Sequence, residues 1–259
     1  MLTLLDARRP AVLVLPELAP ARAVSIPPPP LPDPRSLAAI DDTIVIADFA
    51  GAGIVRWNPA TATWTQSHAG VFAAITGLAV DAARRLLVAD SSGVSRIDPV
   101  DGSVERSYSP PPGERCIGVA VAGDGRIAVT LNPARILVSE DDAATWRELG
   151  GVVRPGAIAG LPTGFAVVDA SARTVEILRT DQPQLTIAAP AGLVGPNAVA
   201  PASDGVVIAD AAMNRVRRYV LAGDRVVPAE FVDGVTMPAW PPLFERVVAL
   251  AAPMPTGAF

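Results

Sequence analysis

One short pattern returns along this chain: an apolar run that ends in Asp, a turn of small residues, and a second apolar run. It reads "IVIADFAGAGIVRWNP" at 44–59, "LLVADSSGVSRIDP" at 86–99 and "VVIADAAMNRVRRYV" at 206–220. The apolar runs end at Asp6, Asp48, Asp90, Thr130, Asp169 and Asp210. Successive ends lie about 40 residues apart, and short strand-like runs with that period predict a β-propeller.

Each period holds four strand-like runs, as the second unit illustrates. "TGLAV" (76–80) is small and apolar, "LLVAD" (86–90) is apolar almost throughout, "VSRID" (94–98) alternates, and "SVERSY" (103–108) is more polar. Four short strands separated by turn residues make one propeller blade. Near-continuous apolar runs indicate burial on both faces, so we expect the first two strands to be buried. The alternating third strand is expected to be partly exposed.

The number of units predicts six blades. Five clear first strands contain Leu37, Gly77, Gly118, Ala157 and Ala198. A sixth, at 247–250, has no further strands after it, whereas residues 2–27 match strands two to four of a unit. We therefore predict an all-β, six-bladed propeller of four-stranded blades that forms a single domain over 1–259. Its last blade combines 1–27 with 245–252, so one C-terminal and three N-terminal strands close the ring and hide its free edges. The alternative is a β-sandwich with accidental periodicity.

The units resemble NHL repeats, which form six-bladed propellers. The resemblance rests on "GLAVD" (77–81) followed by "LLVAD", and on "NAVAPASDGVVIADAAMNRVRRY" from Asn197. It implies a fold but no single activity, because such propellers host enzymes, lyases, scaffolds and RNA binders. One blade also carries "SEDDAATW" (139–146), which looks like the Asp-box turn of other propellers with Ala143 in the glycine place. That likeness implies that Asp141 binds its own turn amides and that Trp146 packs between strands.

A second, more distant resemblance concerns the channel mouth. "GPNAVAPASDG" (195–205) looks like a segment of the gluconolactonase and paraoxonase-like propellers, in which an Asn at the start of an inner strand binds Ca²⁺. Aligning the first strands places these residues at the positions equivalent to Asn197: Ser36, Thr76, Ile117, Gly156 and Arg246. None is a carboxylate, whereas Ca²⁺ takes six to eight oxygen ligands that commonly include carboxylates. We expect Asn197, Thr76 and Arg246 at a channel mouth that holds no metal and no cofactor.

The repeated Asp residues allow two interpretations. Because they end the second strands, they should form a ring on the face that also carries the blade-connecting loops. Such a ring is either a multi-carboxylate cation site, which needs several oxygens to converge, or a set of side chains that each cap the following turn. Recurrence in blade after blade favours the turn caps.

Composition restricts the partners. The chain has a formal net charge of −5 and contains no Lys. Nucleic-acid and anionic-membrane binding need excess positive charge, so we expect neither. The basic cluster "NRVRRY" (214–219) is interpreted as a strand edge with internal ion pairs. Cys116 is the single cysteine, expected to be a buried small hydrophobe, and a lone thiol fits a cytoplasmic location.

His68 is the only histidine. Without a second His, Zn²⁺ sites built on His pairs and Ser–His hydrolysis are disfavoured. The same fact weakens a likeness to virginiamycin-lyase-like propellers, which rely on His. We expect His68 to be exposed in a blade-connecting loop.

Proline is concentrated in the blade-connecting loops. The runs are "IPPPPLPDP" (26–34), "SPPPG" (109–113) and "MPAWPPLF" (237–244). Such segments are stiff and lose little entropy on binding. The candidate partner-binding residues on these loops are Pro29, Pro111, Met237, Trp240, Leu243 and Phe244.

Three functional hypotheses follow. The favoured one is a non-catalytic interaction or scaffold module that binds a protein partner through the proline-rich loops. The second is a lactonase-like hydrolase that acts at the channel mouth. The third is a structural component of a larger assembly, such as a phage-tail-like particle.

Overall fold

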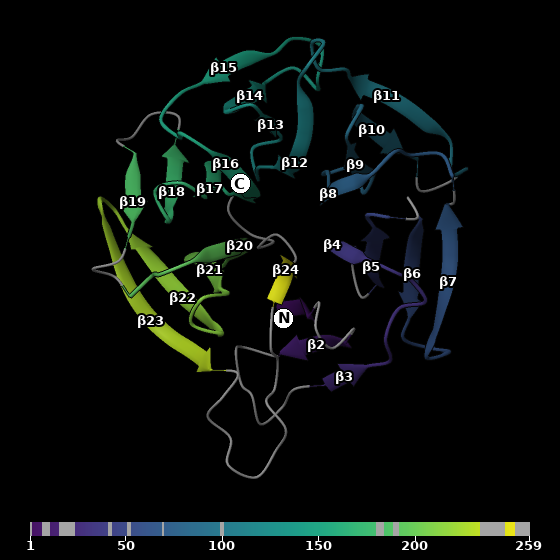
Figure 1. The fold of residues 1–259 in the computed structure, drawn as a ribbon, viewed down its shortest axis with the longest axis horizontal. Coiled ribbons are helices and arrows are strands. Elements are labelled where there is room, and N and C mark those ends of the chain that lie inside the picture. Colours follow the sequence, from purple (N-terminus) through teal and green to yellow (C-terminus); the bar gives the residue numbers. More distant parts are fainter. Residues whose placement is uncertain are drawn as a thin grey trace.

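The computed structural model shows an all-β propeller (Figure 1). The structure describes residues 2–6, 11–15, 24–40, 43–50, 53–68, 70–98, 101–179, 184–188, 192–233 and 247–251. Over these ranges the chain forms six four-stranded sheets, in which neighbouring strands pair antiparallel. No helix long and apolar enough to cross a membrane occurs in these ranges.

Five blades are continuous in sequence. The first contains β4 (Pro34–Ile40), β5 (Thr43–Asp48), β6 (Ile54–Asn58) and β7 (Thr63–His68). The second contains β8 (Ile75–Val80), β9 (Leu86–Asp90), β10 (Gly93–Ile97) and β11 (Val104–Tyr108). The third contains β12 (Arg115–Val121), β13 (Ile127–Asn132), β14 (Arg135–Ser139) and β15 (Arg147–Leu149). The fourth contains β16 (Pro155–Leu161), β17 (Gly164–Asp169), β18 (Thr174–Arg179) and β19 (Leu185–Ile187). The fifth contains β20 (Pro196–Ala202), β21 (Gly205–Asp210), β22 (Arg215–Ala222) and β23 (Arg225–Asp233).

The sixth blade joins the two ends of the chain, as the repeat count predicts. Its strands, in spatial order, are β24 (Val247–Ala251), β1 (Leu2–Asp6), β2 (Ala11–Leu15) and β3 (Val24–Ile26). Leu250 pairs with Leu4, and Leu5 pairs with Val12. The innermost strands β4, β8, β12, β16, β20 and β24 contact one another in turn around the centre, so the ring is closed.

The inner strands carry small residues because the six blades come together at the centre of the ring. The first strands meet at the centre, where backbones of adjacent blades approach closely. A Cβ atom added at Gly160 of β16 would lie only 1.7 Å from the carbonyl oxygen of Val121 on β12. An inner strand therefore needs glycine at such a position.

Burial differs from the sequence expectation in two respects. The second strands are buried as expected, and β21 is buried over its whole length. The prediction of partly exposed third strands is wrong for β10, which is also buried throughout. The reason is that a fourth strand covers its edge and the neighbouring blades cover its faces. The prediction that the first strands are buried is also wrong for most of β8, which is only half-buried because the first strands line the central channel.

Strand register corrects the repeat alignment in the third blade. Leu86 and Ile127 occupy equivalent places, because they pair with Val80 and Val121 respectively. Counting along the strands from these pairs places Leu131, rather than Thr130, at the position that Asp90 holds in the second blade. The third blade therefore has no carboxylate where its neighbours have one.

Candidate functional site: the loop face and the channel mouth

One face of the propeller carries the blade-connecting loops together with the turns between second and third strands; we call it the loop face. The opposite side, with the remaining turns, is the turn face. Asp169 shows how the loop face is built. Its carboxylate accepts hydrogen bonds from the backbone N–H groups of Val153 (2.8 Å), Ser171 (2.9 Å) and Ala172 (3.0 Å). One buried side chain thus fixes both the loop that enters the blade and the turn that follows Asp169.

The electrostatics of Asp169 agree with this role. Burial alone would raise its pKa, but the hydrogen bonds from Ala172, Val153 and Ser171 together outweigh burial and hold the pKa at about 2. The carboxylate is therefore ionised at neutral pH even though the residue is almost fully buried.

The same arrangement recurs in other blades. Asp210 accepts from the N–H groups of Val194 (2.6 Å) and Ala212 (3.1 Å). Asp90 accepts from Ala73 (3.1 Å) and Ser92 (2.8 Å). These bonds confirm the turn-cap interpretation of the repeated Asp residues. Within the described ranges, no three His, Cys, Asp or Glu side chains come together as metal ligands could.

The third blade lacks the carboxylate and two of its three donors. At the place of Ser171 stands Pro133, which has no N–H group. At the place of Val153 stands Glu114, whose N–H donates to the carbonyl oxygen of Pro111 (3.1 Å). A surface ion pair connects these two segments instead: the Arg135 guanidinium donates to the Glu114 carboxylate at 2.7 Å. Leu131, which replaces the Asp, is fully buried.

A bulge at the start of every inner strand defines the channel mouth. Each first strand skips one or two residues in its pairing with the second strand. Bulges of this kind re-aim a side chain at the rim of a sheet. The bulge residues are Arg35, Thr76, Ile117, Gly156, Asn197 and Val248. The sequence alignment was therefore one residue off at Ser36 and two off at Arg246, because it ignored the bulges.

This ring does not fit a Ca²⁺ site. Its side chains comprise one guanidinium, one hydroxyl, one amide and apolar or absent groups, with no carboxylate. The hydroxyl of Thr76 is used within the fold, because it lies 3.0 Å from the carbonyl oxygen of Cys116 on the next inner strand. Thr76 therefore connects the second and third blades at the channel mouth.

Cys116 and His68 have structural surroundings. Cys116 is fully buried, as expected, and burial raises the pKa of its thiol to about 12, which removes nucleophilic character at neutral pH. His68 differs from the expectation: it is the last residue of β7 and half-buried rather than a loop residue. Its Nε2 atom lies 3.2 Å from the carbonyl oxygen of Gly102 in the next blade.

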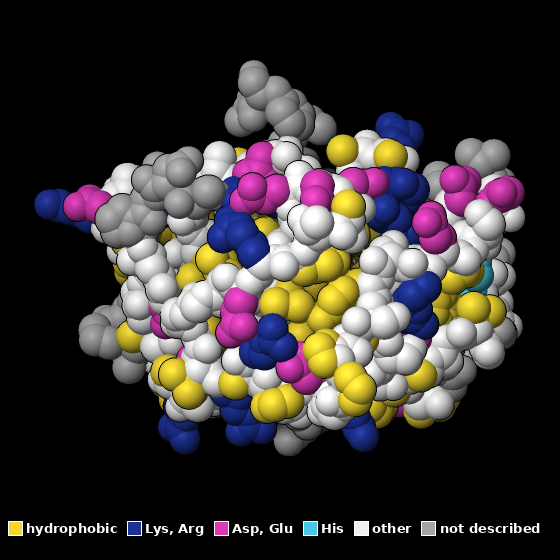
Figure 2. All heavy atoms as spheres, turned by 90° about the horizontal axis from the view of Figure 1, so that it is seen from above, with side chains coloured by type: hydrophobic (Ala, Val, Ile, Leu, Met, Phe, Trp, Pro, Cys, Tyr) yellow, Lys and Arg dark blue, Asp and Glu magenta, His cyan; other side chains and the backbone are white. Residues whose placement is uncertain are grey.

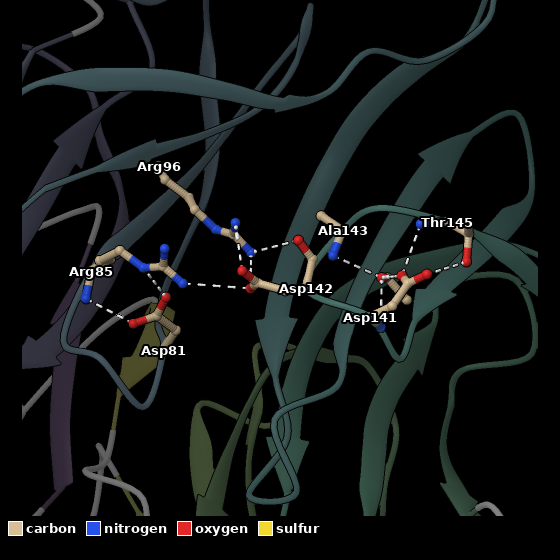
Figure 3. A network of polar contacts seen from close by, with 8 residues as sticks. Asp81, Arg85, Arg96, Asp141, Asp142, Ala143 and Thr145 are labelled. Atoms are coloured by element: carbon tan, nitrogen blue, oxygen red, sulfur yellow. Dashed lines mark hydrogen bonds and ion pairs between the residues drawn. The ribbon is translucent and has the colours of Figure 1, made fainter.

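The Asp-box of the third blade is confirmed as a structural turn. The Asp141 carboxylate accepts from the Thr145 N–H at 2.8 Å, and the Trp146 ring lies 4.8 Å from that of Tyr108 in the second blade. Figure 3 shows that the next residue, Asp142, reaches the second blade as well, where Arg96 and Arg85 bind its carboxylate. Because the opposite charges largely cancel, this cluster joins two blades rather than forming a binding site.

The third and fourth blades also enclose a small cavity. Its volume is about 60 Å³, and Arg126, Phe165 and Leu178 are among its lining residues. That volume holds about two water molecules. Ligand pockets for organic molecules are several times larger, so this cavity is no substrate site.

The proline-rich loops are only partly described. Pro29 is buried and Pro111 is exposed. Met237, Trp240, Leu243, Phe244 and Arg246 lie outside the described residues, so their proposed contact with a partner remains a prediction. In the basic cluster at 214–219, Arg218 forms the expected internal ion pair, with Asp204 at 2.6 Å.

Sequence reasoning missed three arginines on the loop face. Arg115 begins β12, Arg154 directly precedes β16, and Arg173 lies in the β17–β18 turn. All three are exposed. Their positions in the sequence could have indicated them, since each adjoins a blade-connecting loop or a turn after the Asp position. The net negative charge of the whole chain does not reveal such a local group of arginines.

Comparisons with known proteins identify the fold. No protein-family model and no curated protein matches the sequence. A chain in the crystal structure of a nidogen/laminin complex superposes with a TM-score of 0.76 at 16% identity, over 96% of this chain and 97% of that one. Virginiamycin B lyase from Staphylococcus aureus gives a TM-score of 0.63 at 14% identity, over 86% and 78% of the two chains. At these identities the likeness establishes the propeller fold alone.

Proposed function

We propose that this protein is a non-catalytic interaction module that binds a protein partner through its loop face. The observation that carries the proposal is where apolar side chains are exposed. Seven large apolar side chains among the described residues are exposed, and four of them lie on the loop face: Val71, Val153, Val194 and Met213. Apolar groups gathered on one face favour protein association.

The loops that carry these side chains are suited to binding. Two other loops of the same face carry exposed prolines, at Pro27, Pro28, Pro30, Pro32, Pro111 and Pro112. Proline restricts the free chain, and the buried carboxylates hold the neighbouring loops through their backbone. Little conformational entropy is therefore lost when a partner binds. The likeness to a chain in a nidogen/laminin complex is compatible with such a role.

The hydrolase alternative has less support. A lactonase-like mechanism of the resembled family needs Ca²⁺, and the six bulge residues offer no carboxylate to hold it. A lyase mechanism is also disfavoured. The catalytically inactive form of virginiamycin B lyase, solved with quinupristin, carries a His-to-Ala change, whereas His68 here ends an outer strand and contacts Gly102.

Site-specific photo-crosslinking in the producing cells tests the proposal. A benzophenone amino acid is placed in the full chain at Pro111 or Val71 on the loop face. Matched controls carry it at Ala60 or Thr163, which are exposed on the turn face. We expect one discrete protein adduct from the loop-face positions and none from the turn-face positions.

Two outcomes contradict the proposal. Adducts only from the turn face, or from neither face, exclude a partner-binding loop face. Turnover of lactones by the purified protein, together with stoichiometric Ca²⁺, favours the hydrolase instead. The identity of the adduct also tests the third hypothesis, because a structural component of a particle would crosslink to another component of that particle.

A further inference from the structure

Apart from the buried Asp carboxylates that end the second strands on the loop face, charge is divided unevenly between the two faces. The loop-face connections and the first two residues of the strands that leave them contain two acidic residues and six arginines within the described ranges: Asp33, Glu114, Arg35, Arg115, Arg135, Arg154, Arg173 and Arg215. The turn-face connections, counted in the same way, show the reverse, with eleven acidic residues and five arginines: Asp81, Asp98, Asp101, Glu105, Asp124, Glu140, Asp141, Asp142, Glu148, Asp204, Asp224, Arg84, Arg85, Arg126, Arg147 and Arg225. In Figure 2, acidic side chains lie mostly in the upper half, where several arginine side chains accompany them, whereas arginine side chains project from the lower edge with few acidic ones beside them.

Three of the loop-face arginines are available to a partner. Arg35 is engaged by Asp33 at 2.9 Å, and Arg135 by Glu114 at 2.7 Å. The side chains of Arg115, Arg154 and Arg173, in contrast, are exposed and have neither an ion-pair nor a hydrogen-bond partner among the described residues. An Arg without an acidic neighbour retains its full capacity to bind a carboxylate in a bidentate manner.

Exposed apolar side chains lie on the same face as these arginines, on the fourth blade and on the adjacent fifth blade. Val153, which directly precedes Arg154, is 72% exposed, and Val194 and Met213 of the fifth blade are 42% and 40% exposed. The inner strands of the third, fourth and fifth blades contact one another in sequence around the ring. Arg115, Val153, Arg154, Arg173, Val194 and Met213 therefore form one mixed surface, which we call the cationic patch.

The backbone beneath the cationic patch is held in place. Val153, Val194 and Met213 each donate their N–H group to a buried Asp carboxylate, at 2.8, 2.6 and 3.2 Å. The N–H of Ala170 donates to the carbonyl oxygen of Arg154 at 3.0 Å, which joins the loop of Arg154 to the turn of Arg173. These side chains are thus presented on ordered loops, and a preorganised surface binds at lower entropic cost.

From these observations we propose that the cationic patch binds an acidic segment of a partner protein, with apolar residues between its carboxylates. The inference rests on the proposed interaction function and adds the chemistry and the location of the partner. Carboxylates pair with the three arginines, and apolar side chains of the segment cover Val153, Val194 and Met213.

A nucleic acid fits this surface less well. Proteins that bind single strands stack bases on exposed aromatic rings. The described loop-face aromatics are Phe49, which is half-buried with the Arg35 guanidinium 4.9 Å from its ring centre, and Phe72, which is buried. The buried Asp carboxylates beneath the loops also disfavour a closely spaced row of phosphates. A protein segment can place its few carboxylates to match the arginines.

The first part of the test identifies the segment. The benzophenone amino acid is placed at Val194 of the full chain in the producing cells, and the crosslinked segment is sequenced by mass spectrometry. We expect a segment rich in Asp and Glu with interspersed apolar residues. A neutral or basic segment, a nucleic-acid adduct, or no adduct from Val194 overturns the inference.

The second part measures the arginines directly. The identified segment is synthesised as a labelled peptide and titrated with the full chain by fluorescence anisotropy. The double variant Arg154→Glu with Arg173→Glu should raise Kd at least ~10-fold, and added salt should weaken binding to the parent protein. The matched control is the double variant Arg84→Glu with Arg225→Glu on the turn face. Arg84 matches Arg173 because both residues have a positive φ, of 62° and 58° respectively. This control should change Kd by less than ~2-fold.

The two proposals fail in distinguishable ways. An adduct from Pro111 with none from Val194, or an unchanged Kd in the Arg154 and Arg173 variant, overturns the acidic-segment inference and leaves the interaction function standing. Absence of every loop-face adduct overturns both. Circular dichroism melts of both double variants ensure that a change in Kd reflects charge and not unfolding.

Discussion

In the fourth blade, Asp169 connects the entering loop to the following turn from inside the protein, whereas in the third blade Arg135 and Glu114 make the corresponding connection at the surface. The fourth blade offers N–H donors at Val153 and Ser171. The third blade offers none at the matching places, because Pro133 has no N–H group and the N–H of Glu114 is used within its own loop. Leu131 instead adds to the apolar core.

The comparison shows that the buried carboxylate occurs in the blade that supplies its N–H donors and is replaced in the blade that lacks most of them. A buried carboxylate is stable only when several hydrogen bonds replace its hydration. Where prolines remove the donors, an apolar residue is the better occupant, and the loop needs another connection. Blade-connecting loops on this propeller are therefore held by buried charge or by a surface ion pair, according to the N–H groups that the sequence provides.

The largest expected effect comes from giving the fourth blade the residue of the third. Asp169→Leu leaves the N–H groups of Val153, Ser171 and Ala172 without their acceptor. Several buried donors lost together should cost about 3–5 kcal/mol of unfolding free energy. Urea denaturation followed by circular dichroism measures the loss.

The reverse exchange and the surface ion pair provide the controls. Leu131→Asp should also destabilise, because the third blade lacks two of the three N–H donors that hold Asp169: Pro133 has no N–H group, and the N–H of Glu114 is bonded to Pro111. Glu114→Gln should cost much less than Asp169→Leu, since the side chain of its partner Arg135 is one-third exposed. A gain in stability from Leu131→Asp would contradict the account of the third blade.

Acid should weaken the fourth blade by about 2 kcal/mol. The pKa of Asp169 is lowered from 3.8 to about 2 in the folded state, so the carboxylate stabilises the fold above the unfolded value near 3.8. That contribution is lost as the pH falls from about 4 through 2. Urea denaturation between pH 6 and 2 of the parent protein and of Asp169→Asn gives the difference. Identical pH profiles would rule out this role for Asp169.

The smallest expected effect lies in the Asp-box of the third blade. Ala143 has φ of 71°, a left-handed conformation that costs an L-residue about 1–2 kcal/mol. Ala143→Gly relieves this strain. Glycine also raises the entropy of the unfolded chain, which offsets part of the gain, so the free energy of unfolding should rise by about 0.5 kcal/mol. The control Ala144→Gly, at a residue without positive φ, should lower the urea midpoint, while Ala143→Gly raises it.

Much of the architecture could be predicted from residue patterns. The period of the apolar–Asp runs predicts the blades, and the unmatched strands at the two ends predict how the ring closes. Both conclusions depend only on apolar periodicity and on the cost of leaving strand edges unpaired. The Asp-box turn was also predictable, because its residues bond to one another over seven positions of the chain.

The site required the tertiary structure. Bulges shift the alignment by one or two residues, so only the strand register showed that Arg35 and Val248, not Ser36 and Arg246, occupy the channel mouth, and that Leu131 replaces an Asp. The cationic patch likewise combines Arg115, Arg154 and Arg173 from two blades. The sequence by itself determined the repeat, the six blades and their closure, because these follow from local periodicity. Only the tertiary structure decided which side chains share a face, because bulges shift the register and because donors and charges meet between separate segments, 16 residues apart for Val153 and Asp169 and 21 for Glu114 and Arg135.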